Sequence, residues 1–128
     1  MSYYFSKIVG LSFEEALVKA AEELKREGFG ILTEIDVKAT LKKKMNIDFR
    51  NYKILGACNP PFAYEALKNE RMIGTMLPCN VIVQETEEGK AEVAAVDPLA
   101  SMQAIDNPGL EMVAKRIQAK LMKVIERI

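Results

Sequence analysis

The chain has 128 residues, 49% of them hydrophobic, and its 18 basic and 18 acidic side chains leave no net charge at pH 7. This size and apolar content predict a single domain over residues 1–128, with one core and no room for a second domain. A chain without net charge has no overall field that concentrates a polyanion, which argues against a nucleic-acid-binding protein.

A strand and a helix are predicted at the start of the chain. Tyr3–Val9 is a short β-prone run. Ser12 and Glu15 have the spacing of a capping box, so a helix is expected to begin at Phe13. Gly28 is expected to end that helix, because glycine adopts the left-handed conformation of a helix C-terminus without steric cost.

A half-buried strand is predicted next, because Ile31–Val37 alternates apolar and polar residues with a period of two. Its polar face carries Glu34 and Asp36, which form either a solvated sheet face or an acidic pair that contributes to a site. A brief helical segment with three lysines follows and is expected to be held in place by Leu41 and Met45.

A strand-to-helix junction is predicted in the middle of the chain. Tyr52–Cys58 reads as a strand that runs directly into Asn59, a residue suited to an N-cap. Pro60 then suits the first helical position, and the helix should extend to about Asn69.

Two further strands are predicted to form a hairpin. Cys79–Thr86 and Lys90–Val96 alternate on either side of a short turn that contains Gly89. The pairs Asp97-Pro98 and Asn107-Pro108 then repeat the cap-then-proline signal of a helix start.

The last segment has the clearest helical pattern. Its apolar residues form one stripe, which we expect to dock on the protein's own sheet or on a twin subunit. The stripe consists of Leu110, Val113, Ala114, Ile117, Leu121, Val124, Ile125 and Ile128.

The order of elements is therefore β-α-β-β-α-β-β-α. A hairpin with helices gathered toward the ends predicts an α+β fold, a two-layer sandwich in which a mainly antiparallel five-stranded sheet carries its helices on one face. The other face and the sheet edges would need cover, so we expect a homodimer.

Two cysteines are the most distinctive chemical groups, in a chain that has no histidine. Cys58 lies where a strand ends and a helix begins, and the backbone N–H groups and dipole of a helix start favour a thiolate. Gly56 leaves a position without a side chain on the same strand face, where a ligand could approach. Cys79 opens a strand, and a Cys-Asn dipeptide occurs at both places, with Asn59 and Asn80.

Three interpretations of the cysteines remain open. Both thiols could be small core residues. Cys58 could instead be a reactive or redox-sensing thiol, although no histidine is present to activate it. Finally, because two thiolates alone do not complete a zinc site, Cys58 and Cys79 could bind a soft metal such as Cu(I) with Met72 or Met76 nearby, or could pair across a dimer.

Four segments of the chain together resemble the signature of a known family, domain of unknown function 302. They are Gly28–Val37, Ile54–Pro60, Leu77–Val81 and Asp97-Pro98. The resemblance implies a small α+β fold with a closing helix, and homodimers, but no activity. The residues that it marks as distinctive are Gly28, Gly30, Glu34, Asp36, Gly56, Cys58, Asn59, Pro60, Pro78, Cys79 and Asn80.

The leading functional hypothesis is a dimeric module that binds a small ligand or a soft metal around the two cysteines. The candidate ligand-binding residues are Glu34, Asp36, Gly56, Cys58, Asn59, Pro60, Cys79 and Asn80. A thiol-dependent enzyme or redox sensor that uses Cys58, and a purely structural interaction domain, are the alternatives. Whether the protein is an enzyme stays open, and no cofactor is indicated.

The sequence predicts a cytoplasmic protein that does not interact with membranes. No stretch approaches the ~20 consecutive apolar residues of a membrane span. Residues 1–5 also lack the charged and apolar regions of an export signal.

Overall fold

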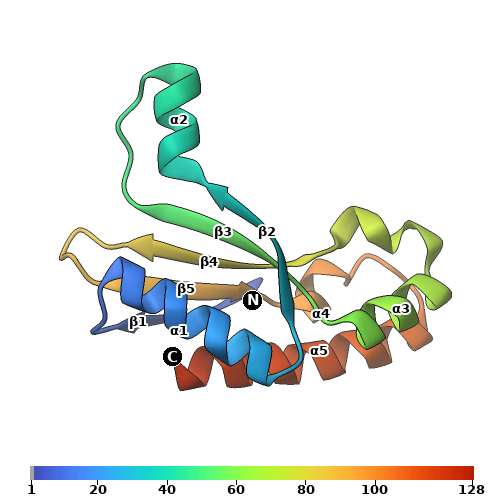
Figure 1. Ribbon diagram of the computed structural model, residues 1–128. Helices are drawn as coiled ribbons and strands as arrows, with labels where there is room; N and C mark the ends of the chain where they lie inside the picture. Colours follow the sequence, from blue (N-terminus) through green and yellow to red (C-terminus); the bar gives the residue numbers. More distant parts are fainter. Residues whose placement is uncertain (1) are drawn as a thin grey trace.

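Five strands form one antiparallel sheet, in the order β1-β5-β4-β3-β2, in the computed structural model, which describes residues 2–128 (Figure 1). This sheet and its helices confirm the predicted α+β class. The elements in chain order are β1 (Tyr4–Val9), α1 (Phe13–Arg26), β2 (Gly30–Asp36), α2 (Val37–Met45), β3 (Tyr52–Cys58), α3 (Pro60–Asn69), the 3₁₀ helix η1 (Arg71–Met76), β4 (Cys79–Glu85), β5 (Ala91–Val96), α4 (Pro98–Ser101) and α5 (Pro108–Arg127).

The core lies between the sheet and two helices, α1 and α5, which run along the same face of the sheet (Figure 1). Alternate residues of the central strands point into it, and Val81, Val83 and Val93 are completely buried. Leu24 of α1 and Leu121 of α5 are equally buried on the helix side. Burial of this apolar surface is the main favourable term in folding the domain.

The ends of α1 form as predicted. The Ser12 hydroxyl accepts a hydrogen bond from the Glu15 backbone N–H at 3.1 Å, and the Ser12 N–H donates to the Glu15 carboxylate at 3.0 Å. At the other end Gly28 has φ +87°, and the Phe29 N–H donates to the Leu24 carbonyl at 2.9 Å. This left-handed turn directs the chain from α1 into β2.

A carboxylate at the end of α1 ties that helix to α5. Glu27 accepts a hydrogen bond from Arg127 at 2.7 Å and lies 3.6 Å from Lys120, with only 11% of its side chain exposed. Burial tends to raise the pKa of Glu27, but Arg127 and Lys120 outweigh it and hold that pKa below 4.5. The ion pairs therefore stabilise the docking of α5 only while this carboxyl is ionised.

We expect Glu27→Gln to lower the free energy of unfolding at pH 7 and to flatten its dependence on pH. A carboxyl with a lowered folded-state pKa contributes stability above its unfolded pKa, and loses it as pH falls through the folded value. Urea denaturation from pH 7 down to about pH 3 measures the difference, which should shrink as pH falls through the lowered folded-state pKa. Glu22→Gln, which alters an exposed glutamate on the same helix, is the control.

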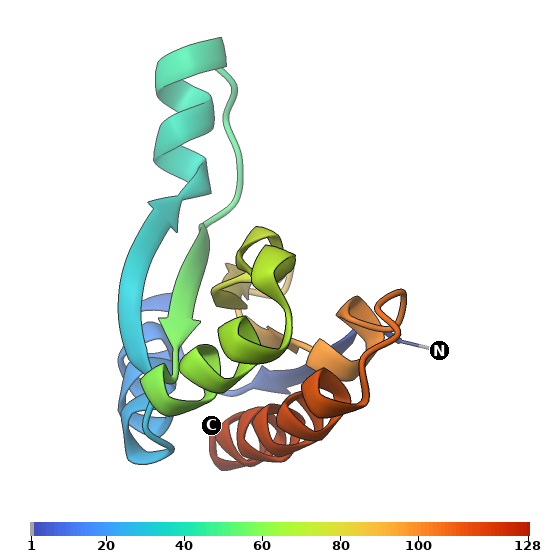
Figure 2. The ribbon, with the colours of Figure 1, turned by 90° about the vertical axis from the view of Figure 1, so that its right-hand side faces the viewer.

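The segment from β2 to the start of β3 departs from the prediction. Every residue of β2 is exposed, and α2 buries none of its residues, so neither the half-buried strand nor the anchoring by Leu41 and Met45 is observed. Met45 is 62% exposed. Figures 1 and 2 show an arm that projects from the rest of the domain and consists of the far end of β2, α2 and the return into the start of β3.

The local sequence explains why α2 forms without packing on the core. The Asp36 carboxylate caps it by accepting a hydrogen bond from the Ala39 N–H at 2.9 Å, and Asn46 closes it with φ 54°. Nine residues with lysines in the last turn are nevertheless too few and too polar to bury a face. Among residues 2–128, no helix has the length and apolar character needed to cross a membrane.

Candidate functional site

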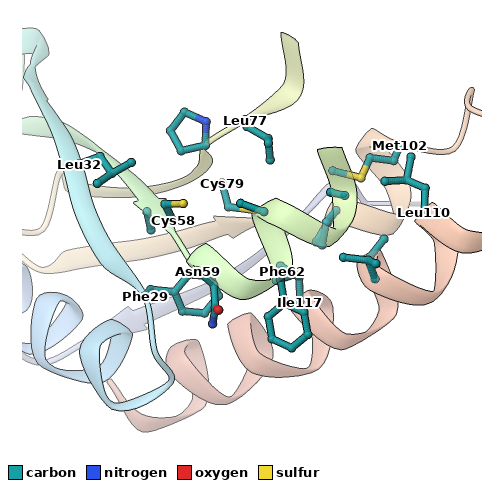
Figure 3. Close-up of a pocket in the computed structure, with 17 residues that line it drawn as sticks. Phe29, Leu32, Cys58, Asn59, Phe62, Leu77, Cys79, Met102, Leu110 and Ile117 are labelled. Carbon is teal, nitrogen blue, oxygen red and sulfur yellow. The ribbon is translucent and has the colours of Figure 1, made fainter. Parts of the chain in front are cut away.

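An apolar cavity of about 230 Å³ lies where the ends of β3 and β4 meet α3, α4 and α5 (Figure 3). Its walls are almost entirely hydrocarbon, and none of its lining residues is acidic or basic. The larger apolar side chains that line it are Phe29, Leu32, Phe62, Leu77, Met102, Leu110, Val113 and Ile117. Cys58, Asn59 and Cys79 are the lining residues with a thiol or amide side chain.

Both cysteines line this one cavity, from adjacent strand ends (Figure 3). Cys58 is the last residue of β3 and Cys79 the first residue of β4. The strands pair so that Cys79 lies opposite Ala57, which places the two cysteines one residue out of register. Both are free thiols.

The two thiols have different surroundings. Cys79 is 8% exposed, and its burial, together with the nearby Cys58, raises its pKa to about 11. Cys79 is therefore protonated at neutral pH. Cys58 is half-buried and reachable from the open side of the cavity. Any chemistry with a solute must begin at Cys58.

Asn59 links two parts of the fold instead of capping α3. It is 7% exposed, and its side-chain amide donates a hydrogen bond to the Glu27 carbonyl at 3.1 Å. The same amide nitrogen lies 3.2 Å from where a side chain on Gly28 would begin, so this contact and the positive φ both favour glycine there. Asn59 thus fixes the end of α1 against the start of α3, beside Cys58.

The helix start beside Cys58 offers less to a thiolate than the sequence suggested. Helix α3 begins at Pro60, as predicted, but Pro60 and Pro61 occupy its first two positions. Proline has no backbone N–H, so two of the donors expected at a helix N-terminus are missing. Pro60 itself does not line the cavity.

The two predicted acidic residues lie outside the cavity. Glu34 pairs with Lys53 at 2.8 Å on the arm, and Asp36 caps α2. Asn80 is also outside, because it follows Cys79 by one residue and strand alternation directs it to the opposite face of the sheet. Of the eight candidate residues, the structure brings together Cys58, Asn59 and Cys79.

Gly56 permits close packing between strands, not access for a ligand. A side chain there would collide with the Thr33 hydroxyl and would begin 2.8 Å from Cγ of Pro78. Gly56 is buried and does not line the cavity. It therefore allows Pro78 to approach the sheet just before Cys79.

Gly56→Ala is expected to lower the free energy of unfolding by about 1–3 kcal/mol, because the added methyl group overpacks this contact. Denaturant unfolding measures the change. Gly10→Ala is the control, since no atom lies within 4 Å of the added methyl position. Equal effects of the two substitutions would show that the crowding at Gly56 is not what requires glycine.

The side chains of the remaining walls could not be recognised as a site from the sequence. Met102, Leu110 and Ile117 carry the same apolar signal as any core position. Met72 and Met76, considered as sulfur ligands, do not line the cavity, whereas Met102 does. No group of three or more His, Cys, Asp or Glu side chains within residues 2–128 is arranged to hold a metal ion.

The fold and the cavity define a small two-layer α+β domain with two thiols in the wall of an apolar cavity. Residues 5–128 match the family described as domain of unknown function 302, and the chain belongs to this family, as its sequence segments predicted. The crystal structure of an uncharacterized conserved protein of this family from Bacillus stearothermophilus is similar over 99% of this chain and 98% of that one, with a TM-score of 0.92 and 27% sequence identity. No curated protein matches the chain.

Proposed function

We propose that the protein is a homodimeric module that binds a small, largely apolar ligand in the cavity walled by Cys58 and Cys79. The hydrocarbon lining carries this proposal. At about 230 Å³ the cavity exceeds an engineered apolar cavity of about 150 Å³ that binds benzene. A ligand of one or two rings, or a short aliphatic chain, fits this volume.

The chemistry of the lining favours a neutral ligand. An ionised group would be desolvated in the cavity without an opposite charge to pair with, because no acidic or basic side chain lines it. Cys58 and Asn59 can contact one polar atom of the ligand at the edge. A few polar groups in an apolar cavity are the usual means of orienting a small molecule.

Cu(I) is the second candidate, favoured by the two thiols and the Met102 thioether in one cavity. The raised pKa of Cys79 weighs against it, because metal binding would have to remove a proton from a thiol that holds it up to a pH of about 11. The apolar ligand requires no such ionisation. Titration of the reduced protein with Cu(I) tests this candidate separately.

A second copy of the chain is proposed to cover the sheet face opposite α1 and α5. That face holds an open groove of about 730 Å³, with Tyr4, Tyr52 and Ile82 among its lining residues. The arm also leaves Ile35 and Met45 exposed. Sedimentation analysis should give twice the monomer mass. A monomer would refute the dimer while leaving ligand binding to be judged by itself.

We place the module in the cytoplasm, where free thiols persist.

Isothermal titration calorimetry with indole tests the ligand proposal. Indole is a neutral two-ring molecule with one polar atom, and saturable binding of one molecule per chain is expected, with a dissociation constant below about 1 mM. Burial of apolar surface should make the heat-capacity change negative. Absence of binding by indole and by 1-octanol, an aliphatic probe with one hydroxyl, would refute the proposal.

A further inference from the structure

We infer that Cys58 and Cys79 are a redox modification site, at which a hydroperoxide converts the two thiols into a reversible disulfide within one chain. The inference does not depend on ligand binding. It depends on the relative position of the two thiols and on their different access to solvent.

The strand register gives the Cα atoms of the two cysteines a separation that a disulfide can span. Residues paired across antiparallel strands have Cα atoms about 5 Å apart, and one residue along a strand adds about 3.4 Å. Cys79 pairs with Ala57, so Cys58 is one step away, at about 6 Å between Cα atoms. Disulfides usually span Cα separations of 4.4–6.8 Å.

Strand alternation alone would direct Cys58 and Cys79 to opposite faces of the sheet. Both residues are still paired in the sheet, Cys58 with Gly30 and Cys79 with Ala57, so closing the disulfide requires local rotation at the strand ends, where Cys58 leads into α3 and Cys79 follows Pro78. Both side chains line the same cavity, as Figure 3 shows. The cavity also provides space in which a sulfur atom can turn toward its partner.

The surroundings define the order of the two chemical steps. Cys58 is half-buried at the cavity and pairs across the strands with Gly30, which has no side chain to obstruct an incoming solute. Cys79 is buried, so a solute reaches Cys58 first. The chain has only these two cysteines, so each is the other's only partner within one molecule.

The reaction is balanced with hydrogen peroxide as the oxidant. The Cys58 thiolate attacks one peroxide oxygen, the O–O bond breaks, and Cys58 becomes a sulfenic acid while the other oxygen leaves as water after taking up a proton. The Cys79 sulfur then attacks the Cys58 sulfur and displaces the hydroxyl group as a second water. Two thiols and one peroxide give one disulfide and two waters, with two electrons passing from sulfur to oxygen.

The second step should accelerate as pH rises. The fraction of Cys79 present as the attacking thiolate increases about tenfold per pH unit below its pKa of about 11. Cys58 is the only other titratable group that lines the cavity. No acidic or basic side chain faces it from any of the surrounding elements, which are the α1–β2 turn, β2, β3, the η1–β4 link, β4, α3, α4 and α5. At neutral pH the sulfenic acid should therefore persist long enough to be trapped with dimedone.

The test treats the reduced full-length chain with hydrogen peroxide at pH 7 and pH 9. The expected product loses two hydrogen atoms, migrates as a monomer on a non-reducing gel, yields a peptide pair joined through Cys58 and Cys79, and reverts with dithiothreitol. The disulfide-forming step, followed after the peroxide is removed, should be roughly 100-fold faster at pH 9. Cys79→Ala should stop at a dimedone-reactive Cys58, and Cys58→Ala should leave Cys79 largely unoxidised.

The wild-type chain decides the outcome even if a variant folds poorly. Oxidation of Cys58 without the internal peptide pair would overturn the inference, as would a disulfide found only between two chains. A disulfide-forming step that is no faster at pH 9 would contradict the assignment of Cys79 as the second thiol. Indole binding is measured separately, so failure of the ligand proposal would leave this result unaffected.

Discussion

Ala63→Phe should weaken indole binding at least tenfold while the protein stays folded. Ala63 lines the cavity from α3 and is only half-buried, so a larger side chain can enter the empty volume without displacing a fully packed neighbour. The ring would occupy space that the ligand needs. A tenfold loss corresponds to about 1.4 kcal/mol of binding free energy. Calorimetry gives the affinity, and thermal unfolding shows whether the domain remains intact.

Ala119→Phe is the matched control, because it adds the same ring to an exposed position of α5 outside the cavity. It should bind indole with wild-type affinity. If the Ala63 variant also binds normally, the ligand occupies another site, such as the groove on the opposite sheet face. If both variants lose binding, the effect comes from a general disturbance of the fold.

The sequence could predict the fold because its local signals agree with its long-range packing. The capping box at Ser12, the glycine turn at Gly28 and the proline at the start of α3 each act within a few residues, and each is found in the structure. The apolar stripe on α5 could be predicted equally well, because its apolar residues recur with the period of a helix that packs one face on a sheet.

The arm was less predictable for a physical reason. Alternation over 31–37 is the pattern of a half-buried strand, and β2 does form, but all of its residues are exposed and its register shifts between Ile31 and Thr33. Periodicity reports which face is apolar, but it does not report whether any part of the same chain covers that face. Ile35 therefore has the sequence signal of a buried residue and remains exposed in the single chain.

The candidate site was predictable only in part. Cys58 and Cys79 stand out because cysteine is rare in this chain, and the structure places both in one cavity. Glu34 and Asp36 are also residue types typical of functional sites, yet Glu34 pairs with Lys53 and Asp36 caps α2. The cavity itself arises from the way α3 and α5 pack against the sheet. It therefore has no signal in any single residue of the sequence.

Leu121→Ala is expected to lower the free energy of unfolding by about 2–5 kcal/mol. Leu121 is completely buried at the centre of the apolar stripe of α5, and truncation removes contacts and leaves a cavity that the surrounding core fills only partly. The next residue, Met122, is 41% exposed on the other side of the helix. Met122→Ala should change stability by no more than about 0.5 kcal/mol.

The pair of variants distinguishes the two roles that the sequence allowed for α5, docking on its own sheet or on a twin subunit. If the stripe packs within one chain, the loss in Leu121→Ala should not depend on protein concentration, because unfolding then involves no dissociation step at that surface. Urea denaturation at two concentrations tenfold apart measures this. A loss of similar size in Met122→Ala, or one confined to dilute protein, would assign the stabilising contacts of α5 to the subunit interface instead.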